Sequence, residues 1–361
     1  MISILFCLSC GDECDDQDVS IMPIDTLYIA DSIGVEMGDS NYVFGSISDF
    51  DYAPDGRILI LDGIQCCIFV YSRSGEFIKR IGRTGSGPGE MQFPSMLEVL
   101  GNGTLCVKDQ PFWYIYDPEG IFISSIHLGR SVPMSMISVG TEGVVGIRNR
   151  MDFLETGELQ VTKRIALWNG IIPDSIETVY FEQEFLLNLE DTPNNVYRMD
   201  LFSAISTAGE DRVYVAPSPT DTPVIYCYRF DGSIADTLYL PYDEVPKSLS
   251  EIEEEKFLIE LVYSQGTDMT MVWEPLPNRP MIRCMGVDSL DYLWVQRGTE
   301  LSPTFDIFDN RGNLLYTAGL PDREDAYNWR FDISPGGIIA VPEDPEFYPL
   351  LYTIDQKSAT H

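Results

Sequence analysis

The sequence predicts an all-β protein, a six-bladed β-propeller with four antiparallel strands in each blade. The sharpest copy of the repeat runs from Ile47 to Pro94, where apolar runs flank a Pro54-Asp55-Gly56 turn and then a Ser74-Gly75 turn. β-Branched and aromatic residues favour strands, and glycine permits the positive φ of a tight turn. A four-strand unit that recurs at intervals of tens of residues is typical of propeller blades.

Turn residues mark both hairpins of the expected blades. Six first-hairpin turns face only five second-hairpin turns, so the last blade, which begins at Trp329, runs out of chain after its third strand. The run from Leu27 to Ala30 has no blade of its own. We expect it to pair near Leu351 to Ile354 and close the ring, because closure removes exposed strand edges. The expected first turns are Gly56, Gly103, Gly143, Gly209, Asp288-Ser289 and Gly336-Gly337, and the second are Gly75, Gly120, Gly170, Gly232 and Gly312.

One insertion, at residues 243–280, interrupts the strand pattern between the fourth and fifth blades. Its residues 248–263 have the apolar spacing of a helix, with Ser248 or Ser250 as the N-cap and glutamates in the first turn. A proline-rich segment then returns the chain to a strand. Insertions in repeat proteins often lie on the binding face. The helix is therefore either a lid or an element packed on the rim.

The N-terminal residues resemble the end of a bacterial secretion signal. The apolar run from Ile2 to Leu8 is too short to span a bilayer. It leads into Leu8-Ser9-Cys10-Gly11, which resembles the lipobox of lipoproteins and implies acylation of Cys10. We therefore expect residues 1–20 to form a signal remnant and a flexible tail, and residues 21–357 to form the propeller.

The chain is strongly acidic. Its 57 Asp and Glu residues against 23 Lys and Arg residues give a formal net charge of −34. Such a surface repels nucleic-acid phosphates and anionic lipid headgroups, so we expect no nucleic-acid partner and membrane contact only through the lipid anchor. The eight cysteines predict no disulfide framework, since Cys66 and Cys67, for example, are adjacent in a strand and point to opposite faces.

The run from Ile81 to Pro94 resembles the interblade signature of NHL-type repeats, in which a glycine-rich turn, a polar residue, an aromatic residue and a proline lead into the next blade. Together with the lipobox, the mature chain resembles the six-bladed β-propeller lipoproteins of gut Bacteroidota. The resemblance implies a monomeric propeller in the periplasm or at the cell surface, anchored to the outer membrane. It implies no particular activity, because most members of that family have none assigned.

Two familiar catalytic arrangements cannot be assembled from this sequence. Only His127 and His361 are present, too few for a three-histidine zinc site, and His127 lies in an outer strand where a Ser-His-Asp triad is not expected. A calcium-dependent hydrolase site would need hard oxygen ligands at the channel ends of first strands. Asp49, Glu98 and Asn328 suit that role. The alternative function is therefore a lyase or hydrolase that uses a divalent cation, such as Ca²⁺, on a carbohydrate-like substrate.

Basic residues at the ends of second strands predict a different site. First strands start and second strands end at one face of a propeller, where ligands of this fold usually bind. We expect a noncatalytic cell-envelope protein that binds an anionic glycan, a peptide or an envelope protein at that face, without a cofactor. The alternative is that each arginine pairs with a neighbouring carboxylate. The candidate ligand-binding residues are Lys108, Arg148, Arg150 and Arg297, with Trp113, Trp294 and Trp329 as stacking platforms.

Overall fold

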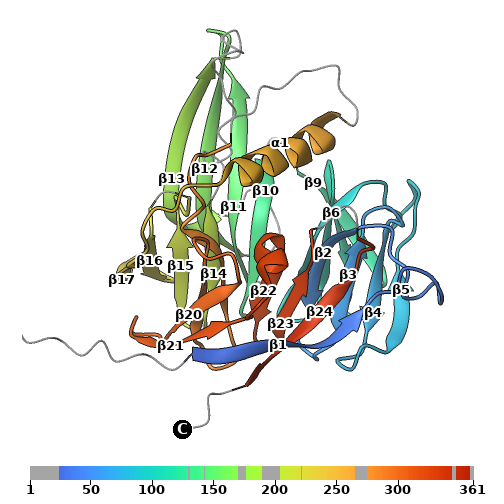
Figure 1. The fold of residues 1–361 in the computed structure, drawn as a ribbon. Helices are drawn as coiled ribbons and strands as arrows, with labels where there is room; N and C mark the ends of the chain where they lie inside the picture. Colours follow the sequence, from blue (N-terminus) through green and yellow to red (C-terminus); the bar gives the residue numbers. More distant parts are fainter. Residues whose placement is uncertain are drawn as a thin grey trace, which may run out of the picture.

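The computed structural model describes residues 24–128, 131–141, 143–169, 176–188, 204–220, 222–264, 275–343 and 347–357. It confirms the all-β prediction: six four-stranded antiparallel blades surround a central axis (Figure 1). Cys10 and the expected tail at residues 1–20 lie outside the described residues, as does the turn expected at Gly170.

The first three blades follow one another along the chain, each with its first strand innermost. Blade 3 has much longer second, third and fourth strands, which rise above the ring in Figure 1. Blade 1 contains β2 (Ile47–Tyr52), β3 (Ile58–Asp62), β4 (Cys67–Tyr71) and β5 (Phe77–Ile81); blade 2 contains β6 (Pro94–Val99), β7 (Leu105–Asp109), β8 (Phe112–Tyr116) and β9 (Phe122–His127); blade 3 contains β10 (Ser131–Val139), β11 (Gly143–Phe153), β12 (Glu158–Asn169) and β13 (Ile176–Asn188).

The last three blades complete the ring, and the final one borrows its outer strand from the N-terminal end of the described chain. Blade 4 contains β14 (Ile205–Ala208), β15 (Arg212–Ala216), β16 (Val224–Arg229) and β17 (Ile234–Tyr239); blade 5 contains β18 (Ile282–Val287), β19 (Leu293–Arg297), β20 (Thr304–Phe308) and β21 (Leu314–Gly319); blade 6 contains β22 (Arg330–Ser334), β23 (Gly337–Val341), β24 (Leu351–Lys357) and β1 (Ile24–Ile33), after the short 3-10 helix η2 (Glu324–Asn328).

Ring closure by β1 is confirmed. This strand runs antiparallel to β24, with Ile29 opposite Ile354 and Ile33 opposite Leu351. Its first three residues also pair in parallel with the end of β21, which joins blades 5 and 6 into one eight-stranded sheet. This second pairing was not predicted. The N-terminal strand therefore closes blade 6 and also ties it to blade 5.

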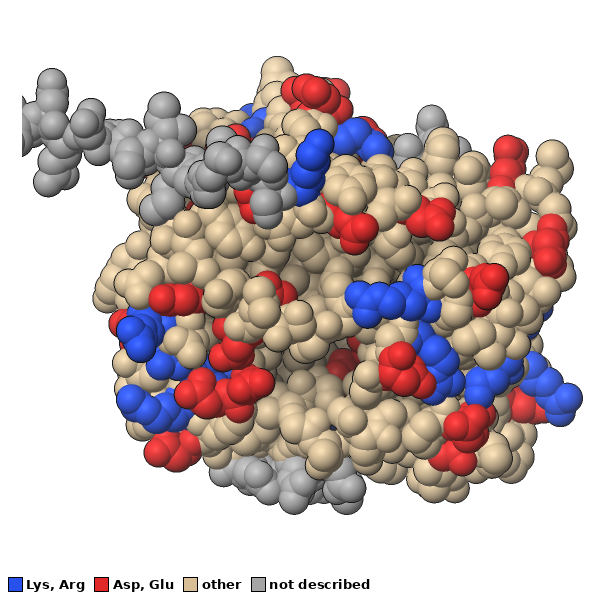
Figure 2. Space-filling model, turned by 90° about the horizontal axis from the view of Figure 1, so that it is seen from below, with Lys and Arg blue, Asp and Glu red and all other residues tan. Residues whose placement is uncertain are grey.

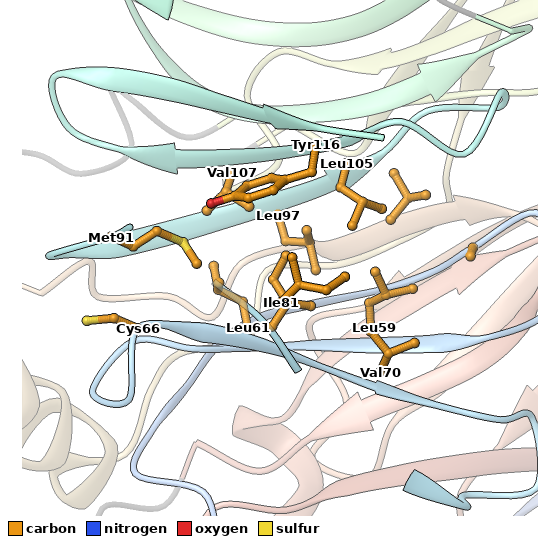
Figure 3. Packing of buried hydrophobic residues seen from close by; sticks show 13 residues of the cluster. Leu59, Leu61, Cys66, Val70, Ile81, Met91, Leu97, Leu105, Val107 and Tyr116 are labelled. Carbon is orange, nitrogen blue, oxygen red and sulfur yellow. The ribbon is translucent and has the colours of Figure 1, made fainter. Parts of the chain in front are cut away.

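The hydrophobic core is divided into layers between neighbouring blades. Strand β3 is buried along its whole length because its two faces serve two layers. Leu59 and Leu61 pack toward blade 2, whereas Ile58 and Ile60 pack toward blade 6. Figure 3 shows the layer between blades 1 and 2, where Leu61 and Val107 come from second strands of the two blades. Burial of each such side chain contributes roughly 1.5–3 kcal/mol.

The inserted helix is confirmed as α1 (Leu249–Ser264), between β17 and β18. Ser248 and Glu251 form a reciprocal capping box: the Ser248 N–H donates to Glu251 Oε2 at 2.8 Å, and the Glu251 N–H donates to Ser248 Oγ at 3.3 Å. Arg279 holds Glu251 through two hydrogen bonds of 2.7 and 3.1 Å. The helix is thus attached to the segment that leads into blade 5. It lies at the same end of the ring as the β11–β12 turn (Figure 1). We call this end of the ring the upper face.

None of the helices in the described ranges is long and apolar enough to cross a membrane.

Candidate functional site: the central cavity

A cavity of about 1370 Å³ occupies the centre of the ring. Its wall is formed mainly by first strands from all six blades, because the innermost strand of each blade faces the axis. Seen from below, the molecule is hollowed at its centre, and acidic side chains are visible inside (Figure 2). We call this opening the lower mouth. It is bordered by the first-hairpin turns of the blades, which include Gly56, Gly101, Gly140, Glu210, Ser289 and Gly336.

The turns at the lower mouth pack closely enough to restrict their sequence. A Cβ atom on Gly101 would lie 1.8 Å from the carbonyl oxygen of Gly140 in the next blade. Only glycine permits that approach. The mouth is therefore a fixed ring of turns in this region.

Four of the carboxyl groups that line the cavity are carried by first strands. Asp49 and Asp51 lie on β2 of blade 1, Glu98 lies on β6 of blade 2, and Asp332 lies on β22 of blade 6. These are the first strands of three consecutive blades. The acidic groups therefore occupy one side of the cavity wall.

Two of these carboxylates connect neighbouring blades. Asp49 accepts a hydrogen bond of 2.8 Å from the backbone N–H of Leu97, and Asp51 accepts one of 2.8 Å from Val99. Both acceptors are on β2 and both donors are on β6. No continuous backbone ladder joins these two strands, so the carboxylates satisfy N–H groups that would otherwise be unpaired.

A related contact recurs at the ends of second strands. Asp62 accepts a hydrogen bond of 2.7 Å from the N–H of Gly45, and Asp109 accepts bonds of 2.6 and 2.9 Å from Gln92 and Phe93. Each donor precedes the first strand of the same blade. Buried aspartates therefore fix the entry of the chain into blades 1 and 2.

Burial and mutual repulsion raise the pKa values of the cavity carboxyls. The pKa of Asp49 rises to about 6 because of burial, although the Leu97 N–H and the charge of Arg330 oppose the shift. The pKa of Asp332 rises to about 7 through burial and the neighbouring Asp49. Burial raises the pKa values of Asp51 and Glu98 well above the ordinary range, and nearby carboxylates add to the effect. The cluster therefore retains protons near neutral pH.

The basic residues nearest the cluster are already engaged. Arg330 donates to the carbonyl oxygens of Ser48 and Ile47 at 2.8 and 2.7 Å and forms an ion pair of 2.7 Å with Glu343. It thereby fastens blade 6 to blade 1. Lys108 is partly buried, which lowers its pKa, while the charge of Asp49 opposes that shift.

The basic residues predicted to form a binding rim have other contacts. Arg150 forms an ion pair of 2.7 Å with Asp152. Arg297 holds buried Asp306 through two hydrogen bonds, of 3.0 and 2.7 Å. Arg148 is buried, with its guanidinium 4.3 Å from the centre of the Trp168 ring. Each of these three arginines thus contacts a different neighbour within the protein.

The three predicted stacking platforms are buried in the core. Trp113 is 0% exposed, Trp294 2% and Trp329 5%. Trp294 donates its indole N–H to Asp288 at 2.9 Å, and Trp329 stacks on Tyr352 with ring centres 4.8 Å apart. Trp113 and Trp294 are packed in the layers between blades. Trp329 also lines the cavity, but its ring lies between Tyr352 and the Arg323 guanidinium, which is 4.6 Å from the ring centre. The three rings are buried, and their role in stacking on a sugar stays a prediction.

The candidate cation ligands do not converge. Asp49 and Glu98 line the cavity, but Asn328 ends η2 and does not. Within the described part of the chain, no three His, Cys, Asp or Glu residues are grouped so as to hold a metal ion.

Sequence reasoning missed Asp51 and Asp332. Both lie in first strands, at Asp49-Phe50-Asp51 and Phe331-Asp332-Ile333, where a carboxylate alternates with apolar residues. Alternation in a first strand places the polar side chains toward the axis. That signal could have identified them.

Comparison with known proteins agrees with the architecture. A family described as a 6-bladed beta-propeller (DUF5128) matches residues 35–105. No curated protein matches the sequence.

Several solved structures align over most of the chain. A putative exported protein of Bacteroides fragilis is 15% identical with a TM-score of 0.45, covering 92% of this chain and 96% of its own. A DUF4221 family member of Bacteroides vulgatus is 10% identical with a TM-score of 0.48, covering 94% and 98%. Virginiamycin B lyase of Staphylococcus aureus is 10% identical with a TM-score of 0.40, covering 93% and 89%. At these identities the likenesses concern the fold alone.

Proposed function

We propose that this protein is a noncatalytic binding protein of the cell envelope whose ligand occupies the central cavity and enters through the lower mouth. The observation that carries the proposal is the cavity of about 1370 Å³ with polar groups on its wall. Ligand sites in proteins are typically concave and of several hundred to about 1,000 Å³. A cavity that is both open and polar is suited to a ligand with several hydrogen-bonding groups.

The cavity supports binding better than the upper face does. An anionic glycan or peptide at the upper face would need free cations, whereas Arg150 and Arg297 are held by Asp152 and Asp306. Such a ligand would have to displace those carboxylates. We therefore place the ligand in the cavity, and a glycan, a peptide or a segment of an envelope protein could each reach it through the lower mouth.

A divalent-cation lyase or hydrolase is the less supported alternative. Asp49 already uses both carboxylate oxygens to accept N–H groups, from Leu97 and Phe50. Glu98 lies on the neighbouring strand, and within the described residues no three His, Cys, Asp or Glu side chains are grouped so as to hold a metal ion. Turnover that is abolished by a chelator and restored by Ca²⁺ would favour this alternative.

A thermal-shift screen of neutral, cationic and anionic oligosaccharides and peptides tests the proposal. A ligand that binds the folded state raises the melting temperature by mass action. The matched variant is Glu210→Trp with Ser289→Trp, which adds bulk to two turns at the lower mouth. The control is Asp211→Trp with Leu290→Trp, exposed residues of the same turns that do not line the cavity.

The expected result is a ligand whose affinity falls at least about tenfold in the mouth variant and is unchanged in the control. Equal affinity in both variants would contradict binding through the lower mouth.

We also propose that acylation of Cys10 anchors the protein to the outer membrane, in the manner that the lipobox resemblance implies. The support is the sequence around Cys10. Two or more acyl chains give stable attachment, whereas one does not. Protein expressed with a complete signal should partition into detergent, and Cys10→Ser should remain in the aqueous phase. Membrane fractionation of Cys10→Ser like that of the wild type would place the anchor elsewhere.

A further inference from the structure

We propose that the ligand of the central cavity carries an organic ammonium group, which is bound by Asp51, Glu98 and Asp332. This inference rests on the proposed binding function and specifies its chemistry. It concerns the acidic side of the cavity wall, where the first strands of blades 6, 1 and 2 meet.

Arg283 and Arg330 also line the cavity, but in the described part of the chain neither forms an ion pair with these three groups. Among the described residues, no ion pair involves Asp51, Glu98 or Asp332. The groups that act on Asp51 and Glu98 are the other carboxyls of the cluster and backbone N–H groups. Arg330 acts on Asp49 but is bound to two carbonyl oxygens and to Glu343. A positive charge in the cavity would therefore favour the ionised forms of these carboxyls, so that binding of an ammonium group is coupled to the release of protons.

Incomplete hydrogen bonding at the same place is an independent observation. Oδ2 of Asp332 and Oγ of Ser334 both belong to residues that line the cavity, and neither atom has a hydrogen bond of normal geometry, although the Ser334 hydroxyl is near enough to oppose the rise in the pKa of Asp332. Buried polar atoms are nearly always paired, because leaving one unpaired costs about 1–3 kcal/mol. A hydrogen-bond donor from a ligand would supply the hydrogen bond that Asp332 Oδ2 lacks.

The same geometry favours an ammonium group over a metal ion. Ca²⁺ takes six to eight oxygen ligands at about 2.3–2.6 Å, which requires carboxylates that converge on a point. No such group of three exists in the described ranges. An ammonium group instead supplies three hydrogen-bond donors and needs only two or three acceptors, fewer than Ca²⁺ requires. Anionic ligands would be repelled by the same wall.

Three five-carbon probes with matched chains test the inference: 1,5-diaminopentane, 1,5-pentanediol and glutarate. Their ends are cationic, neutral and anionic. Binding is measured at pH 7.5 by titration calorimetry and by the ¹³C signals of the side-chain carboxyls. We expect the diamine to bind at least about tenfold more tightly than the diol, and glutarate to show no binding. The diamine should shift the carboxyl signals of Glu98 and Asp332.

Variants of the same size then test which carboxyl groups contact the diamine. Glu98→Gln and Asp332→Asn, each measured singly, should weaken diamine binding at least about fivefold and leave the diol unchanged. Glu119→Gln serves as the control, because it removes an exposed carboxylate in the turn before β9 that does not line the cavity. Diamine binding no tighter than diol binding, or diamine affinity equal in Glu98→Gln, Asp332→Asn and the control, would overturn the inference.

The outcomes separate this inference from the proposed function. If an oligosaccharide or peptide from the screen binds through the lower mouth while the diamine does not bind, the cavity remains the site and the ammonium inference fails. A second outcome is that the diamine binds equally to the wild type and to Glu210→Trp with Ser289→Trp, without shifting the ¹³C signals of the Glu98 and Asp332 carboxyls. In that case both the placement of the ligand in the cavity and the ammonium inference are contradicted.

Discussion

At the scale of single residues, enclosed carboxyl groups have two different roles in this protein. Some hold backbone N–H groups at fixed positions, as Asp109 does for Gln92 and Phe93. Others, such as Asp332, line the cavity with an oxygen that has no partner. The first kind stabilises the fold, whereas the second is destabilising unless the group is protonated or meets a donor.

Asp109→Asn should destabilise the protein. The amide keeps one acceptor but places an NH₂ group against a backbone N–H, so one buried donor loses its partner. We expect a loss of about 1–3 kcal/mol in the free energy of unfolding, measured by urea denaturation. Asp211→Asn, on an exposed turn, should stay within about 0.5 kcal/mol of the wild type. A loss no larger in Asp109→Asn than in this control would show that the two hydrogen bonds contribute little.

Asp332→Asn should make the protein more stable at high pH and leave it unchanged at low pH. The pKa of Asp332 is about 7 in the folded state, above its ordinary value in the unfolded chain. The unfolded chain therefore loses this proton first as pH rises, and wild-type stability falls between about pH 4 and pH 7. Asparagine cannot ionise and removes that loss. Melting temperatures of the two proteins should diverge between about pH 4 and pH 7 and then differ by a constant amount up to pH 8, and a difference that does not change with pH across this range would contradict the raised pKa.

Turn residues could be predicted from the sequence, whereas the face of a strand to which a side chain points could not. The glycines of tight turns, such as Gly56 and Gly75, have positive φ as expected, because turn chemistry is local. The side chains of Trp113 and Arg148 could not be oriented from sequence alone. A shift of one residue in register moves a strand side chain to the opposite face, and each face of an inner strand belongs to a different interblade layer.

At the scale of elements, β1 has two roles. It supplies the outer strand of blade 6 through its pairing with β24, and it joins blade 5 through Ile24 to Thr26. The first pairing was predictable because the last blade lacked a strand and the N-terminal run lacked a blade. The second was not, since a three-residue parallel pairing between Ile24–Thr26 and Thr317–Gly319 leaves no pattern in the sequence.

Removal of residues 1–38 should therefore destabilise the whole ring. This truncation deletes β1 and exposes the edges of both β24 and β21. Removal of residues 1–20 leaves β1 intact and should not change the melting temperature. We expect a markedly lower melting temperature, or aggregation, only for the longer truncation. Equal melting temperatures would show that β1 does not close the ring.

At the scale of the whole molecule, six blades bring polar side chains from distant parts of the sequence to one axis. Asp49 and Asp332 are 283 positions apart in the chain yet line one cavity. The ring was predictable from the repeat, but the acidic wall was not, because it depends on which inner strands are neighbours and how each is rotated. The sequence instead predicted a binding site at the upper face, because basic residues at the ends of second strands are unusual in an acidic chain.

The most direct test of the central claim, that the ligand occupies the central cavity, is hydrogen–deuterium exchange of the wild-type protein with and without a ligand from the screen. Ligand binding slows exchange where it stabilises the backbone. We expect added protection concentrated in the first strands β2, β6 and β22 and in the turns of the lower mouth. Protection confined to α1 and the upper ends of β11 to β13, with the first strands unchanged, would contradict it.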